Sequence, residues 1–181
     1  MKNIFFIGLP GVGKSFWAKK IADWYGVNFA DLDTEIELRL GRPIFNLFET
    51  QGEHIFREIE KDILIEFAQK SNVVISVGGG TPCYFENLSV MKQNGVCVYI
   101  KDHIESIGNR LFLDKTNRPL FKDCQTVPKI VLKLHELHLK RHPIYSQSHV
   151  IIDVESLQKP HLFTKRLELF TKPDFWLNEA K

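Results

Sequence analysis

The segment Gly8-Leu9-Pro10-Gly11-Val12-Gly13-Lys14-Ser15 has the residue types and the spacing of a phosphate-binding loop. Its glycines allow backbone conformations with positive φ, so the N–H groups of residues 11–15 can point at phosphate oxygens. Lys14 would place a positive charge between the β- and γ-phosphates, and the Ser15 hydroxyl would coordinate Mg²⁺. The pattern therefore predicts a site for a nucleoside triphosphate with magnesium.

A second group of candidates is the pair of carboxylates in Asp31-Leu32-Asp33, at the end of a predicted strand over residues 27–32. Residues two apart in a strand project to the same face, so both carboxylates can face the phosphates. One would then hold the magnesium shell and the other a substrate hydroxyl. The alternative is a solvated strand end, with Asp33 capping a helix ahead of Glu35 and Glu37, and spacing alone leaves both interpretations open.

The elements that must position these residues alternate along the chain. Short apolar runs predict buried strands at 4–7, 27–32, 73–77, 96–100 and 150–152. Amphipathic stretches predict helices at 14–25, 52–70, 86–94, 104–111, 127–141 and 156–171. Strand alternating with helix indicates an α/β fold with a mostly parallel sheet, which binds ligands at the carboxyl ends of its strands.

Composition limits the classes of protein. The chain has 181 residues, which makes a single domain over 1–181 the default, and its 44% hydrophobic and 25% charged residues are those of an ordinary globular protein. With 24 Lys+Arg against 22 Asp+Glu, the net charge of +2 indicates neither nucleic acid nor a membrane surface as partner. Three cysteines without disulfide or zinc spacing fit a reducing compartment, and no apolar stretch has the length of a membrane span. We expect a cytoplasmic monomer.

A phosphate-binding loop alone does not separate a kinase from a GTPase. The sequence contains no guanine-reading Asn-Lys-x-Asp motif, and Lys115-Thr116-Asn117-Arg118 does not match it, which weakens the switch interpretation. The polar stretch Leu113–Cys124, around Pro119, is the best candidate for a long mobile loop. Its alternative is a plain surface connection.

Four further motifs follow the phosphate-binding loop in order: Gly-Glu-His-Ile-Phe-Arg-Glu-Ile-Glu at 52–60, Gly-Gly-Gly at 78–80, Asn-Arg-Pro-Leu at 117–120 and Arg-His-Pro-Ile-Tyr at 141–145. Together with the Asp-x-Asp pair, they resemble the shikimate kinases, a nucleoside-monophosphate-kinase-like P-loop family, over about residues 2–155. The resemblance implies a three-layer P-loop kinase fold, with a central five-stranded parallel sheet flanked by helices and a mobile lid over about residues 113–124. It also implies Mg²⁺-dependent transfer of phosphate from ATP to the 3-hydroxyl of shikimate, in aromatic amino acid biosynthesis.

The resemblance further implies roles for single residues. Asp33 would bind the ring hydroxyls nearest the attacking oxygen, while Asp31 would reach Mg²⁺ through water and Ser15 would bind the metal directly. Arg57 and Arg141 would grip the substrate carboxylate. The implied sets are, for ATP, Gly11, Val12, Gly13, Lys14, Ser15, Phe16, Arg110 and Arg118; for the substrate, Asp33, Arg57, Gly79, Gly80 and Arg141; for catalysis, Lys14, Asp33 and Arg118; and for the pocket lining, Phe48, Phe56, Glu60, Pro119 and Leu120.

Helical spacing bears on the two arginines. Arg141 continues the apolar stripe of the helix predicted over 127–141, so it lies on the buried face and needs an anionic partner. That partner is either a substrate or a structural carboxylate. Arg57 lies at the edge of its stripe with Glu53 and Glu60 in helical reach, so a surface ion pair is its alternative explanation.

Two features leave the function open. Phe16 stands where the family commonly has a hydroxyl residue that touches the α-phosphate, and Arg110 corresponds only by loop length to an arginine that stacks on adenine. The alternatives are a P-loop kinase of another small hydroxy acid, such as gluconate, and a nucleotide-binding regulatory protein with little catalysis. The combination of Lys14, Ser15 and Asp33 with the lid arginine argues against the regulatory alternative.

Overall fold

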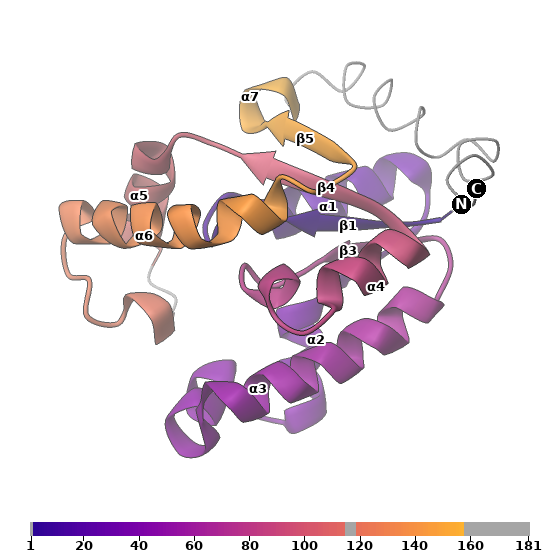
Figure 1. Cartoon of the computed structure of the whole chain (residues 1–181), viewed down its shortest axis with the longest axis horizontal. Helices are drawn as coiled ribbons and strands as arrows, with labels where there is room; N and C mark the ends of the chain where they lie inside the picture. Colours follow the sequence, from indigo (N-terminus) through magenta and orange to yellow (C-terminus); the bar gives the residue numbers. More distant parts are fainter. Residues whose placement is uncertain (1, 115–118, 158–181) are drawn as a thin grey trace.

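The computed structural model of the chain describes residues 2–114 and 119–157. Five parallel strands form one sheet in the order β2-β3-β1-β4-β5, with helices on both faces (Figure 1). The strands are β1 (Asn3–Ile7), β2 (Asn28–Asp31), β3 (Val73–Ser76), β4 (Gly95–Lys101) and β5 (Val150–Asp153). The helices are α1 (Lys14–Tyr25), α2 (Leu32–Leu40), α3 (Ile44–Gln69), α4 (Asn87–Asn94), α5 (Ile104–Leu113), α6 (Val127–Tyr145) and α7 (Val154–Leu157), with 3₁₀ turns η1 (Thr81–Cys83) and η2 (Pro119–Phe121).

The predicted fold class is confirmed. All five predicted strands are present, and the sheet is entirely parallel. The helix predicted over 14–25 has these bounds as α1. The helix predicted over 156–171 lies almost wholly outside the described residues. No helix in the described part of the chain is both long and apolar enough to cross a membrane.

Strand β1 is the centre of the core. Every residue of β1 is buried, and Ile4 pairs with Val74 of β3 on one side and with Val96 of β4 on the other. A strand that is covered by helices on both faces has a continuous run of apolar residues in its sequence, as in Asn-Ile-Phe-Phe-Ile here. Three neighbouring strands, β2, β3 and β1, therefore end side by side at one edge of the sheet.

The boundary after β2 differs from the prediction. The strand ends at Asp31, which is the N-cap of α2 and accepts a hydrogen bond from the backbone N–H of Thr34 at 3.2 Å. Asp33 lies in the first turn of α2 and not on a strand. The prediction that both carboxylates share one strand face is therefore wrong, and Asp31 rather than Asp33 caps the helix.

Helix α3 begins earlier than predicted, at Ile44, and is interrupted at Gly52. Gly52 has φ 81° and ψ 171°, a conformation that strains any residue with a Cβ atom. The predicted start at residue 52 coincides with this break. The second section of α3 carries Arg57 and Glu60 toward the carboxyl ends of the strands.

Buried Asn3 ties the start of β1 to the turn between α3 and β3. Its Nδ2 donates to the carbonyls of Ala68 (3.0 Å) and Lys70 (2.7 Å), and its Oδ1 accepts from the backbone N–H of Val73 (3.1 Å). These three backbone groups of the turn are thereby satisfied by Asn3, which is only 1% exposed. The side chain sets where α3 stops and β3 begins.

Replacing Asn3 by the similarly sized Leu should lower the free energy of unfolding by about 2–3 kcal/mol, because three buried backbone groups lose their partners. Urea unfolding followed by circular dichroism measures the change. The control is Asn109→Leu on the exposed side of α5, which should leave stability nearly unchanged. Equal losses in the two variants would show that the hydrogen bonds of Asn3 do not matter.

Candidate active site

The phosphate-binding loop connects β1 to α1 and needs its glycines for two reasons. Gly8, Gly11 and Gly13 have φ values of 149°, 78° and 95°, which residues with a Cβ atom rarely adopt. A Cβ atom on Gly11 would also lie 2.6 Å from Cγ of Leu111 in α5. The loop can therefore pass close to α5 and lead directly into the N-terminus of α1, the end of a helix that attracts anions.

Lys14 and Ser15, at the end of this loop, make polar contacts with the ends of the neighbouring strands and with the loop itself. Lys14 Nζ donates to the carbonyls of Gly8 (3.2 Å) and Leu9 (3.1 Å), which holds the ammonium group over the loop. Ser15 Oγ donates to Oδ2 of Asp31 at 2.5 Å and lies 3.1 Å from Oγ of Ser76. The ends of β1, β2 and β3 thus contribute to one group of oxygens.

This oxygen group fits magnesium. Mg²⁺ prefers hard oxygen ligands and is usually held by one or two carboxylates with substrate phosphates and water. Asp31 and Ser15 are such ligands, beside the loop where phosphates would lie. Within the described residues, no cluster of three or more His, Cys, Asp or Glu side chains could hold a metal ion.

A cleft of about 1180 Å³ opens at this edge of the sheet and brings most of the predicted site residues together. Its lining includes Gly11, Gly13, Lys14, Ser15, Phe16, Asp31, Asp33, Arg57, Gly79, Gly80 and Arg110. The pocket residues Phe48, Phe56, Glu60 and Leu120 line it as well. Val12 lines a second cavity of about 460 Å³, which is also lined by residues 153–156.

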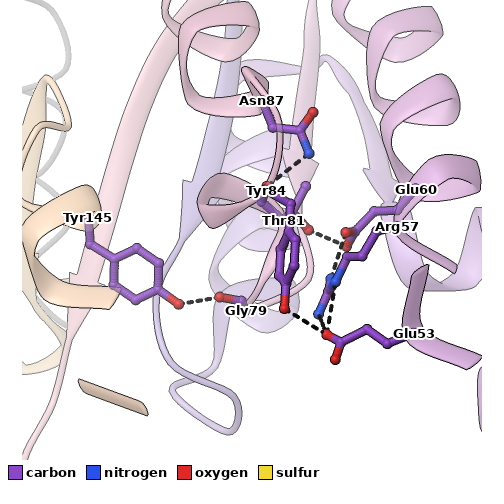
Figure 2. Close-up of polar contacts among 8 residues, drawn as sticks. All are labelled: Glu53, Arg57, Glu60, Gly79, Thr81, Tyr84, Asn87 and Tyr145. Atoms are coloured by element: carbon purple, nitrogen blue, oxygen red, sulfur yellow. Dashed lines mark hydrogen bonds and ion pairs between the residues drawn. The ribbon is translucent and has the colours of Figure 1, made fainter. Parts of the chain in front are cut away.

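Arg57 is buried and held by two carboxylates. Its Nη1 donates to Oε2 of Glu60 at 2.6 Å, while its Nη2 and Nε donate to Oε1 of Glu53 at 2.9 and 3.2 Å (Figure 2). The rings of Tyr84 and Phe56 lie 4.2 and 4.8 Å from its Cζ. Sequence spacing predicted both ion pairs, but a surface location is wrong, because Arg57 is only 5% exposed.

Arg57 keeps two N–H donors beyond those bonded to Glu53 and Glu60. A guanidinium has five N–H donors, and the three bonds to Glu53 and Glu60 leave one on Nη1 and one on Nη2. Two N–H groups on neighbouring nitrogens match the two oxygens of a carboxylate. Tyr84 contributes to this orientation, since its hydroxyl donates to Oε1 of Glu53 at 2.9 Å.

The charges of this network are coupled. Burial raises the pKa of Glu60, and the Arg57 guanidinium and the Thr81 hydroxyl, which donates to Oε1 of Glu60, oppose the rise. Burial lowers the pKa of Arg57, but Glu60 and Glu53 more than compensate, so the pKa of Arg57 lies above its ordinary value. Although burial raises the pKa of Glu53, Arg57 and Tyr84 bring it below the usual range. The guanidinium therefore stays charged.

Arg141 approaches the same place from α6. It is 7% exposed on the buried stripe of the helix, as predicted. Among the described residues its Nη1 is buried and has no hydrogen-bond partner, so the expected structural carboxylate does not satisfy that nitrogen. A buried guanidinium nitrogen without an acceptor is the feature expected of an anion site.

The triple glycine packs bare backbone against these charged groups. A Cβ atom on Gly80 would lie 2.4 Å from Nη2 of Arg57, and one on Gly79 would lie 3.1 Å from Nη1 of Arg141. A Cβ atom on Gly78 would lie 3.0 Å from Oδ1 of Asp33. The glycines thus lie beside all three predicted substrate-binding side chains, and side chains there would displace them.

Three residues of the set implied for ATP remain to be placed. Phe16 is 59% exposed, with its ring 5.2 Å from that of Trp17. Arg110 Nη2 donates to Oδ2 of Asp102 at 2.5 Å at the rim of the cleft. Arg118 lies outside the described residues, as do residues 115–118 of the predicted lid generally, so the structure does not place the lid arginine.

Sequence reasoning missed several residues that support the site: Glu53 as an orienting group, Ser76, Thr81, Tyr84 and Tyr145. Ser76, Thr81 and Tyr84 come from β3 and the segment after it, and their partners are distant in sequence. Tyr145 was detectable, because it continues the buried stripe four residues after Arg141. A buried tyrosine hydroxyl needs a polar partner.

The fold and the cleft define a class of protein: a P-loop kinase, in which a phosphate-binding loop and a pocket for a small anionic acceptor open into the same space. The sequence matches the shikimate kinase family over residues 10–171, and the chain belongs to that family.

Individual relatives agree with this. The shikimate kinase of Parabacteroides distasonis is 37% identical over 157 residues, which cover 87% of this chain and 90% of that protein. The crystal structure of shikimate kinase from Bacteroides thetaiotaomicron is 32% identical with a TM-score of 0.83, covering 91% of this chain and 98% of that one. The Acinetobacter baumannii enzyme in complex with shikimate is 31% identical with a TM-score of 0.83, covering 95% and 96%. A gluconokinase from Sinorhizobium meliloti, 14% identical with a TM-score of 0.55 over 93% of each chain, shares the fold alone.

Replacing Glu60 by Gln should lower the free energy of unfolding by about 3 kcal/mol, because the buried guanidinium of Arg57 loses its fully buried counter-charge. Urea unfolding measures the loss. The matched control is Glu66→Gln, which breaks an ion pair with Arg39 that is exposed on both sides and should change stability little. Similar effects in the two variants would contradict a special role for the buried pair.

Proposed function

We propose that this chain catalyses the transfer of the γ-phosphate of ATP to the 3-hydroxyl of shikimate, giving shikimate 3-phosphate and ADP, as a step in the biosynthesis of aromatic amino acids. The observation that supports this best is the pair of buried guanidinium groups, Arg57 and Arg141, on the triple glycine. Arg57, Gly79 and Gly80 line the same cleft as the phosphate-binding loop, and Arg141 lies behind Gly79, outside the lining. Two such groups are suited to a rigid carboxylate. Because the chain belongs to the shikimate kinase family, shikimate is favoured over other carboxylates as the acceptor substrate.

On the donor side, the backbone of residues 11–16 holds the phosphates and Lys14 supplies a positive charge. Ser15 and Asp31 would hold the Mg²⁺, and when bound this ion neutralises charge on the β- and γ-phosphates. Arg110 lies at the rim, where it would contact the adenine, and Phe16 contributes its backbone N–H rather than a hydroxyl. Arg118 is assigned to the lid that covers the phosphates.

On the acceptor side, the two free N–H groups of Arg57 and the Nη1 group of Arg141 bind the carboxylate, which fixes the ring. Asp33, whose Oδ1 lies 3.0 Å from the position of a Cβ atom on Gly78, binds the ring hydroxyls. Gly79 and Gly80 let the substrate ring approach the backbone closely. Holding the carboxylate at one end and the hydroxyls at the other selects which oxygen faces the phosphate.

The chemistry requires mainly positioning and positive charge. Phosphoryl transfer passes through a loose transition state with negative charge on the equatorial oxygens, which Lys14 and Arg118 stabilise. The 3-hydroxyl oxygen forms the new P–O bond as the bond to the β,γ-bridging oxygen breaks, and ADP leaves with that oxygen. Asp33 orients the hydroxyl and accepts its proton late in the transfer.

The remaining organisation belongs to the same proposal. The chain forms one kinase domain over residues 1–181, with a lid over about 113–124 that closes to exclude water and suppress ATP hydrolysis. It acts as a monomer in the cytoplasm, without a nucleic acid or membrane partner. The net charge of +2 supports this choice of partners.

The direct test of the function is ADP release by the purified protein with MgATP and shikimate, gluconate or quinate. Shikimate alone should give a large, saturable stimulation, and the product should carry phosphate on its 3-hydroxyl. Nucleotide binding without stimulation by any of the three acceptors would contradict the proposal. It would favour a regulatory nucleotide-binding protein instead.

Two substitutions separate the roles of the acceptor site. Asp33→Asn should lower turnover at least about 100-fold while ATP affinity stays nearly intact, because the amide cannot accept the proton. Arg141→Ala should chiefly raise the KM for shikimate, by about 10- to 100-fold, because a charge-assisted bond is lost. Initial rates and calorimetric titration with ADP measure both effects. An equal loss of nucleotide affinity in Asp33→Asn would exclude its assigned role.

A further inference from the structure

Tyr145 lies where the donor and acceptor sides meet. It is the last residue of α6, it is fully buried, and its ring packs 5.0 Å from that of Tyr99 in β4. Arg141 precedes it by one helical turn on the same buried face. Neither the phosphate-binding loop nor the substrate-binding side chains include Tyr145, so the mechanism above leaves this buried phenol unused.

The hydroxyl of Tyr145 reaches two backbone carbonyls from different loops. One is Gly8, the first residue of the phosphate-binding loop, at an O···O distance of 3.3 Å. The other is Gly79, in the triple glycine, with which it makes a short hydrogen bond (Figure 2). These residues are 137 and 66 positions away in the sequence. One hydroxyl therefore contacts the loop that holds the donor and the loop that faces the acceptor.

The two loops leave neighbouring strands and remain close to each other beyond the ends of these strands. The register pairs of β1 and β3 end at Phe6 and Ser76, and the next backbone bond joins the N–H of Val77 to the carbonyl of Phe6 at 3.3 Å. Beyond that bond the loops meet through side chains, and the site that a Cβ atom of Gly79 would occupy lies 3.0 Å from Cδ of Pro10. Tyr145 adds a polar link at this point, past the end of the β-ladder.

We propose that Tyr145 is a positioning residue, which fixes the separation of the phosphate-binding loop and the triple-glycine loop. Its hydroxyl has one hydrogen, which it donates to the carbonyl of Gly79 and shares with the more distant carbonyl of Gly8 in a three-centre hydrogen bond. In-line transfer is sensitive to the distance between the attacking oxygen and phosphorus, and a displacement of about 1 Å can cost about 100-fold in rate. The inference rests on the proposed function, because it takes the triple glycine as part of the acceptor site.

The phenol is suited to this task because it remains a donor. Burial raises the pKa of Tyr145 far above its ordinary value, although the charge of Arg141 opposes the rise. The hydroxyl is therefore protonated near neutral pH. A carbonyl accepts a hydrogen bond only from a protonated group, so the link is in place at the pH of the assay.

The test is Tyr145→Phe, which keeps the ring and removes only the hydroxyl. The kcat of shikimate phosphorylation should fall about 10- to 100-fold. The KM values for ATP and shikimate should change less than about twofold, because the groups proposed to bind each substrate are all still present. ATP hydrolysis without an acceptor should be unchanged, since it does not depend on the triple glycine. Substituting 4-aminophenylalanine, which restores an N–H donor, should recover much of the lost kcat.

The matched control is Tyr99→Phe. In the described part of the chain, the hydroxyl of Tyr99 bonds to neither loop, so this neighbouring variant should retain the wild-type kcat. Thermal unfolding of both variants sets an assay temperature at which each is folded. A Tyr145→Phe kcat within twofold of wild type, an equal fall in acceptor-free hydrolysis, or the same loss in Tyr99→Phe would each overturn the inference. An inactive wild-type protein would instead refute the proposed function.

Discussion

The buried ion pair between Arg57 and Glu60 is the interaction on which the acceptor side of the cleft depends. A charged guanidinium can be kept out of water only if a counter-charge and hydrogen-bond acceptors are already in place, and Glu60 supplies both at 2.6 Å. The second carboxylate oxygen of Glu60 is bound by Thr81, whose carbonyl in turn accepts a bond from Asn87 at the start of α4. The pair therefore links α3, the 3₁₀ turn η1 and α4, and it places Gly80 against the guanidinium face.

The order of the strands in the sheet is the second feature on which the site depends. Because β2, β3 and β1 are neighbours in the parallel sheet, their carboxyl ends bring Asp31, Ser76 and the phosphate-binding loop to one place. Each strand end then continues into a different kind of structure: a glycine-rich loop after β1, a helix after β2 and a bare glycine turn after β3. Donor and acceptor groups thus share one rigid edge, while most of their side chains come from segments that follow it.

The parts of the molecule that the sequence predicted are those with local causes. The loop over residues 11–15 carries its backbone and side-chain donors within a few positions, and the apolar runs that form the strands are continuous. The boundary at Asp31 was misplaced because strand alternation and helix capping compete at the same residues, and capping prevails. Arg57 shows the larger limit: its neighbours in the helix predict ion pairs, but only the folded chain brings Gly80 and Tyr84 over it and excludes water. Whether a charged residue is buried depends on tertiary contacts, which helical spacing in the sequence does not show.

The buried nitrogen of Arg141 has no acceptor in the described residues. At this position the stability of the fold and the proposed catalytic activity therefore favour different side chains. A desolvated donor without a partner costs folding free energy, and an apolar side chain of similar volume at this position would avoid that cost. Laboratory evolution for heat resistance alone would therefore be expected to replace Arg141 early. The resulting variants would be more thermostable but inactive in the proposed reaction. With the role proposed for Arg141, only selection that also requires formation of the reaction product would keep this arginine.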